Sequence, residues 1–216
     1  PAKEVRLEVM TDNIIHVVKV PEAGAQLDPS MMAIATPSAK GFTVAKAGID
    51  AVTLKAPRIS ATVSLKDGKI QFRNDKGQLM LDQYAESFKP VTIGGKPFYE
   101  IKQGFNPNTK DALYGLGQHQ NNQMNLNGED VLLQQHNMDV AVPFLVSDKN
   151  YGILWDNNGI TRFGDPRPYG PINRDLKLTD AKGQEGALTA RYYIGGKLAR
   201  GGRERKINYQ YQRVGG

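Results

Sequence analysis

Residues 114–165 read YGLGQHQNNQMNLNGEDVLLQQHNMDVAVPFLVSDKNYGILWDNNGITRFGD, and this stretch is the most informative part of the chain. A glycine-rich segment, 114–117, opens onto a polar segment dense in asparagine and glutamine, and two apolar stretches follow, the second with the only tryptophan, Trp155. Glycine gives backbone freedom, amide side chains both donate and accept hydrogen bonds, and an aromatic ring offers a flat apolar face. These features suit sugar recognition, whereas sugar cleavage needs a spaced pair of carboxylates.

Apolar stretches of strand length alternate with turn residues along most of the chain. Asp67-Gly68, the turn at 74–77 and the Gly94-Gly95 pair are hairpin signals, and we interpret 114–117 as a glycine-rich turn. No window holds a convincing helical period beyond two turns. Turns that recur every ~8–12 residues predict an all-β fold, an antiparallel β-sandwich. The predicted strands are 5–10, 14–20, 52–55, 59–65, 69–73, 78–82, 97–103, 130–135, 143–147, 152–156, 161–163, 188–194 and 207–211.

Composition bounds the class of protein. The chain has 216 residues, of which 39% are hydrophobic, and no apolar run approaches the ~18 residues that a membrane span needs. The absence of cysteine excludes disulfides, thiolate metal sites and a thiol nucleophile. The start of the chain has no signal-peptide pattern, so we expect that any such peptide has been removed and that the protein is a periplasmic or secreted bacterial one.

The net charge of +6 lies in the last part of the chain. From Arg191 onward there are seven basic residues and one acidic residue, so residues 1–190 carry no net charge. A neutral body with a short basic tail, in which no helix or RNA-binding signature occurs, predicts that the protein does not bind nucleic acid. We expect a domain at 1–190 and a basic, glycine-rich tail at 191–216, which is either the truncated start of a second module or a flexible tail.

Four pieces of the sequence resemble, in order, the N-terminal β-sandwich of glycoside hydrolase family 31. This galactose-mutarotase-like domain precedes the catalytic (β/α)8 barrel in α-glucosidases and α-xylosidases. The pieces are residues 5–18, residues 114–118 (with Gln118 where the family usually has Glu), residues 127–129 followed by Pro143-Phe144, and residues 151–157. Residues 161–167 and 186–193 look closest to bacterial α-xylosidases, some of which carry an inserted sugar-binding module after this point. The tail at 191–216 would then be the start of that module.

The resemblance implies a parent enzyme that cleaves α-glycosides with retention, using two aspartates on barrel loops. The chain has no repeated strand–helix pattern that could build such a barrel. We therefore predict no catalytic residue, no cofactor and no metal site here, and an inactive fragment of an α-xylosidase-like enzyme. The expected partners are the barrel of the same parent chain and an α-xyloside or xyloglucan-type oligosaccharide.

The segment 118–135 is the strongest candidate site. In the family this loop reaches over the mouth of the active site, and the resemblance therefore implies that it shapes the substrate pocket. The predicted pocket-loop residues are Gln118, Asn121, Gln123, Met124 and Asn127. The alternative is a solvated loop with no binding role.

Two other functions stay open. A free-standing sugar mutarotase could use His119, His136 and Glu129 as its acid–base set, and a carbohydrate-binding module would need no enzymatic partner. We interpret His16 as a packed or edge histidine and Trp155 as a core residue. The acidic residues beside turns and strand ends are interpreted as turn formers or solvated charges: Glu129, Asp130, Asp139, Asp156 and Asp165.

Overall fold

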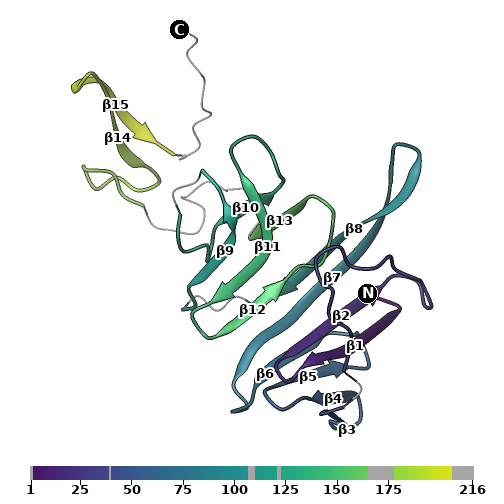
Figure 1. Ribbon diagram of the computed structural model, residues 1–216. Coiled ribbons are helices and arrows are strands. Elements are labelled where there is room, and N and C mark those ends of the chain that lie inside the picture. The colour runs from purple at the N-terminus through teal and green to yellow at the C-terminus, as the bar shows by residue number, and fades with distance from the viewer. Residues whose placement is uncertain (1, 39, 107–109, 121–122, 165–177, 206–216) are drawn as a thin grey trace. The chain divides into compact units, whose positions relative to one another are not determined.

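The computed structural model describes residues 2–38, 40–106, 110–120, 123–164 and 178–205 (Figure 1). The chain divides into two compact units, residues 1–165 and 166–216, and each is described by itself. All strand pairs are antiparallel and no helix occurs in the described ranges, so the prediction of an all-β antiparallel fold is confirmed. Accordingly, the described part of the chain has no helix that is long and apolar enough to cross a membrane.

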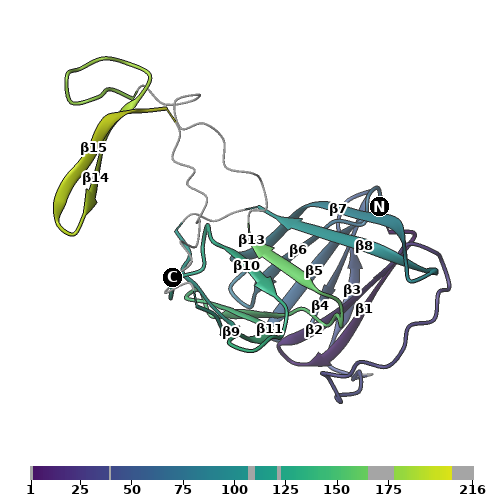
Figure 2. The same ribbon diagram turned by 90° about the horizontal axis from the view of Figure 1, so that it is seen from above.

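The first unit begins with a hairpin and a large sheet. β1 (Glu4–Thr11) pairs with β2 (Ile14–Val20). A six-stranded sheet then follows the chain in order: β3 (Thr43–Lys46), β4 (Ala51–Lys55), β5 (Ile59–Ser64), β6 (Ile70–Asn74), β7 (Leu79–Ile93) and β8 (Lys96–Phe105). Buried Val9 of the hairpin packs with Leu54 and Ala56, so the hairpin covers part of this sheet. Figure 2 shows the hairpin beside the sheet.

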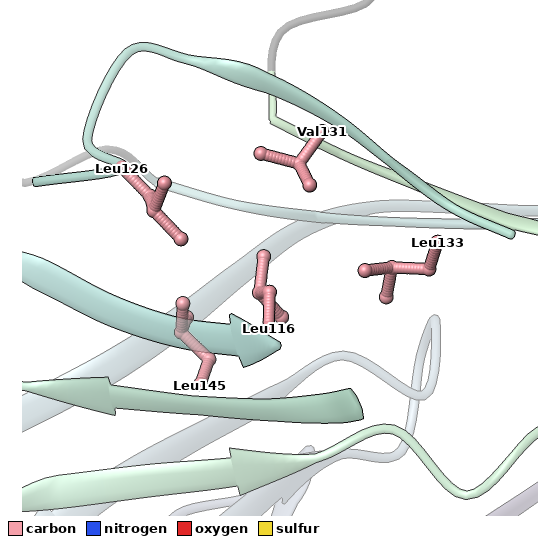
Figure 3. Close-up of a cluster of buried hydrophobic side chains, with 5 residues drawn as sticks. All are labelled: Leu116, Leu126, Val131, Leu133 and Leu145. Carbon is pink, nitrogen blue, oxygen red and sulfur yellow. The ribbon is translucent and has the colours of Figure 1, made fainter. Parts of the chain in front are cut away.

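The rest of the first unit forms two smaller sheets. β11 (Val140–Ser147) lies between β9 (Leu113–Gln118) and β12 (Tyr151–Leu154), and β10 (Asp130–Leu133) pairs with β13 (Thr161–Gly164). Five buried side chains from these elements form one apolar cluster, to which β9, β10, β11 and the segment before β10 all contribute (Figure 3). They are Leu116, Leu126, Val131, Leu133 and Leu145.

The glycine-rich segment that we interpreted as a turn is strand β9. Gly115, Leu116 and Gly117 all have positive φ angles, of 105°, 62° and 99°. A Cβ at Gly117 would overlap the carbonyl oxygen of Val140, so glycine is what allows the neighbouring strand to approach this closely. The glycines that signal a turn in the sequence instead permit a distorted strand pair.

Strand β7 is three times as long as predicted. It pairs with β6 only through Leu79, Leu81 and Asp82, and beyond these residues it pairs only with β8. β7 and β8 therefore project from the sheet as a two-stranded ribbon, closed by the predicted Gly94-Gly95 turn, whose φ angles are 57° and 78° (Figure 1).

The second unit contains the hairpin of β14 (Leu188–Ile194) and β15 (Lys197–Glu204), of which the sequence predicted only the first strand. Arg203 forms a 2.6 Å ion pair with the buried carboxylate of Asp180. The structural division falls at 165/166, and the proposed functional division at 190/191 stays a prediction. The predicted strand at 207–211 lies outside the described residues.

Candidate functional site

The amide-rich segment is anchored at its centre. Leu126 is buried in the apolar cluster of Figure 3, and its amide donates a 2.7 Å hydrogen bond to the Leu113 carbonyl. The side-chain oxygen of Asn125 accepts from the amides of Leu113 and Asn127 at 3.0 and 3.1 Å. Asn127 in turn donates to the Asp111 carbonyl at 2.6 Å. These contacts fix the base of the segment at residues 125–127. We call the segments before this base (118–124) and after β10 (134–139) the two amide-rich arms.

The predicted pocket-loop residues fall into two groups. Asn127 is half-buried at the base, and Gln118 is an exposed residue at the end of β9, opposite Val140. Gln123 is exposed on the arm before the base, and Met124 is 81% exposed. Asn121 lies outside the described residues. The four described residues therefore have different surroundings: Asn127 donates to a backbone carbonyl at the base, whereas Gln118, Gln123 and Met124 are exposed.

The second arm follows β10 and is closed by local contacts. Gln135 donates to the Asp139 carbonyl at 2.9 Å and accepts from the Ala141 amide at 3.2 Å. His136 forms a 2.9 Å contact with the Asp139 carboxylate. The Gln120 amide lies 3.5 Å from the sulfur of Met138, so the two arms are in contact there. The arms carry exposed amide groups and the exposed thioethers of Met124 and Met138.

Both histidines of the possible mutarotase set contact partners outside that set. His119 contacts the Leu116 carbonyl at 2.8 Å, and His136 contacts Asp139. Within the described ranges, no hydrogen bond joins His119, His136 and Glu129. In the same ranges, no group of three His, Asp or Glu side chains could hold a metal ion.

The carboxylates near the loop have structural contacts. Asp130 forms a 2.8 Å ion pair with Arg162 across the β10–β13 pair, and Asp148 accepts the Ala112 amide at 3.1 Å. The hydrogen bond from Lys149 and others nearby lower the pKa of Asp148 despite the opposing effect of desolvation. The buried carboxylate of Asp111 faces the Tyr151 hydroxyl at 3.4 Å. Burial raises the pKa of Tyr151, so this phenol stays protonated at neutral pH.

The β9–β11–β12 sheet has an exposed apolar face that was not predicted from the sequence. On β11, every second residue turns outward while Leu145 and Ser147 are buried. Phe144 lies opposite Leu154, and Val146 lies opposite Tyr114. The side chains of this face are between 38% and 48% exposed: Tyr114, Val140, Val142, Phe144, Val146 and Leu154.

The signal for this face is present in the sequence. Val140, Val142, Phe144 and Val146 alternate with residues that include Ala141 and Leu145, so both faces of the strand are apolar. A strand that is apolar on both faces is typical of a sheet covered on both sides. Trp155, interpreted as a core residue, is half-buried after β12, and its buried indole nitrogen has no hydrogen-bond partner in the described part of the chain.

The chain can be compared with known proteins. Residues 4–163 match the family described as the glycosyl hydrolase 31 N-terminal galactose mutarotase-like domain. The α-xylosidase of Saccharolobus solfataricus is 25% identical over 162 residues, which are 71% of this chain and 22% of that protein.

Two solved structures are also similar. The GH31 α-xylosidase from Xanthomonas citri is 45% identical, with a TM-score of 0.71, over 96% of this chain and 23% of that one. A GH31 α-xylosidase from a soil metagenome, solved with xylose, is 26% identical, with a TM-score of 0.57, over 68% of this chain and 24% of that one. The chain thus spans about a quarter of the length of these relatives. The resemblance inferred from the residues is confirmed, and the chain belongs to the family of glycosyl hydrolase 31 N-terminal galactose-mutarotase-like domains found in α-xylosidase-like enzymes.

Proposed function

We propose that this domain packs on the (β/α)8 barrel of an α-xylosidase-like hydrolase through the apolar face of the β9–β11–β12 sheet and lends its amide-rich arms to the substrate pocket. The observation that carries the proposal is that apolar face. Six large side chains stand side by side at 38–48% exposure on a sheet whose other face is already packed. An exposed apolar patch of this kind is typical of an interaction surface.

The energetics favour burial of this face. Completing the burial of a half-exposed valine, leucine or phenylalanine contributes roughly 1 kcal/mol, since full burial is worth about 1.5–3 kcal/mol. Six such residues would hold two domains of one chain together without a large contribution from charge. No lysine or arginine belongs to the set, so its burial would desolvate no cation.

The amide-rich arms suit the second part of the proposal. Gln123 and Met124 are exposed, while Leu126, Asn125 and Asn127 hold the base of the loop. A rigid base with exposed tips lets side chains reach a neighbouring pocket without changing the fold of the domain. Amide groups can bind sugar hydroxyls, and the proposed substrate is an α-xyloside or a xyloglucan-type oligosaccharide. The proposed location is periplasmic or extracellular.

The packing is tested by placing a charge on the face. In the full-length enzyme, Val142→Lys should lower the melting temperature and the activity on an aryl α-xyloside, because the lysine would have to be buried against the barrel. Val44→Lys is the matched control, because Val44 on β3 is also an exposed strand valine. In the isolated 216-residue chain, both variants should melt like the parent. Equal effects of the two substitutions in the full-length enzyme would reject this face as the interface.

A further inference from the structure

The ribbon formed by β7 and β8 has one mainly apolar face and one face that mixes charged residues with the apolar pair Val91–Phe98. The pairs Phe88–Ile101, Pro90–Tyr99 and Thr92–Pro97 lie opposite each other and share the face from which Glu86 points. The other face carries Lys89 and Lys102, which form ion pairs with Glu100. A ribbon that stands clear of its sheet, with apolar residues along one face, is suited to contact something besides solvent.

A groove lies at the outer end of the ribbon, and its volume is about 370 Å³. Six residues of the ribbon and one residue of the segment after β2 line it: Pro90, Val91, Thr92, Pro97, Phe98, Tyr99 and Glu22. The Tyr99 hydroxyl donates a 2.8 Å hydrogen bond to the Glu22 carboxylate, which joins the two walls and sets the position of the ring. This bond also raises the pKa of Tyr99, so the phenol remains a donor at neutral pH.

The chemistry of the lining limits the ligand. It combines the aromatic rings of Tyr99 and Phe98, which are 38% and 48% exposed, with two proline rings, one valine, two hydroxyls and one carboxylate. It contains no lysine, arginine or histidine. The carboxylate would repel an anionic ligand and accept hydrogen bonds from hydroxyl groups. An aromatic ring beside a hydroxyl acceptor fits a ligand that has an apolar face and polar edges. A pyranose ring has both.

We infer that this groove binds a neutral oligosaccharide, with a sugar ring stacked on Tyr99 and its hydroxyls bonded to Glu22 and Thr92. The volume falls within the range of small-molecule sites. The site is formed by β7, β8 and the segment after β2, and none of its residues belongs to the amide-rich arms. It therefore does not depend on the proposed role of those arms.

The inference is tested by titrating the ¹⁵N-labelled 216-residue chain with a xyloglucan heptasaccharide up to ~20 mM, because a small exposed site is expected to bind with a dissociation constant of about 1–5 mM. The expected result is saturable amide shifts around residues 22, 92 and 99. Tyr99→Ala should weaken binding at least ~10-fold, and Tyr99→Phe about 2–5-fold, because it keeps the ring and loses one hydrogen bond. Tyr193→Ala, at an exposed tyrosine of the second unit, is the control and should bind like the parent.

The spectra of each variant also report whether it is folded, and Thr92→Ala replaces Tyr99→Ala if the latter is not. Thr92→Ala should weaken binding about 2–5-fold, through the loss of one hydrogen bond. The inference is overturned if no saturable shift appears, if the shifts survive both Tyr99→Ala and Thr92→Ala, or if they map only to residues 118–138. That last outcome would leave the proposed role of the amide-rich arms intact and remove this groove as a sugar site.

Discussion

The Lys19 ammonium lies 2.6 Å from the Glu86 carboxylate, and both side chains are only 3% exposed. Lys19 also donates to the Gly68 carbonyl and to the Gln83 side chain, at 2.8 and 2.7 Å. The other oxygen of Glu86 accepts the Ala2 amide at 2.7 Å. This buried network joins the β1–β2 hairpin to the base of the β7–β8 ribbon.

Glu86→Gln should destabilise the domain by about 3–5 kcal/mol, because it leaves Lys19 buried without its counter-charge. Urea unfolding of the isolated chain measures this loss. Glu100→Gln, at an ion pair on the exposed ribbon face, is the control and should have little effect. Adding Lys19→Met to Glu86→Gln should recover part of the stability. If Glu86→Gln unfolds at the same urea concentration as the control, the network does not join the two elements.

The stability of the domain should fall at acid pH with Glu86 as one cause. Burial acts to raise the pKa of Glu86, but the hydrogen bonds from Lys19, Ala2 and Gln83 outweigh it and hold the pKa below its ordinary value of 4.5. A depressed pKa gives stability that is present above the ordinary value and is lost as the pH falls through the folded pKa. Unfolding free energies measured from pH 7 down to pH 3 should show this loss. The loss should be smaller in Glu86→Gln, and identical pH profiles would contradict the assignment.

Gly117→Ala should cost at least about 3 kcal/mol, because the new Cβ meets the Val140 carbonyl and the φ angle of 99° is unfavourable for alanine. Gly128→Ala is the matched control. It has a similar φ of 87° with nothing within 4 Å of the new Cβ, so it should cost only the backbone strain of about 1–2 kcal/mol. Urea midpoints compare the two. Equal losses would show that β9 and β11 do not approach as closely as described.

The isolated chain should not hydrolyse aryl α-xylosides or α-glucosides. Its acidic residues near the loop hold structural contacts, as Asp130 does with Arg162 and Asp139 with His136. Release of 4-nitrophenol from the aryl glycosides by the purified chain provides the measurement. Turnover that disappears when one of these acids is replaced by its amide would refute the prediction.

Local signals in the sequence predicted the hairpins, whereas contacts between residues far apart in the chain could not be predicted from it. The turn between β6 and β7 follows from Asn74 and Gly77: the Asn74 side chain accepts the Gln78 amide at 2.9 Å, and Gly77 has a φ of 74°. The glycines of β9 were interpreted as turn residues, which is the most common role of glycine. Their actual role is to allow the close approach of Val140, and that could not be predicted because Val140 lies on a strand more than twenty residues away.

The same distinction applies to the candidate site. Gln123 and Met124 were predicted from composition and resemblance and lie at exposed positions. Asn125, which anchors the loop, was not singled out. The spacing of Asn125, Asn127 and Gly128 is a local turn signal that could have identified it. The apolar face could have been inferred from β11 alone, but its extent depends on which residues of β9 and β12 lie beside it.

The most direct test of the account is the kinetics of the full-length enzyme that carries Gln123→Ala and Met124→Ala together. The account predicts a fall in kcat/KM for an aryl α-xyloside of up to ~10-fold per lost hydrogen bond, a changed ratio of α-xyloside to α-glucoside activity, and an unchanged urea midpoint of the isolated chain. Asn125→Ala serves as the comparison, since it should destabilise the loop base as well. Full-length kinetics equal to those of the parent enzyme, with a destabilised isolated domain, would show that the loop is structural and would contradict the central claim.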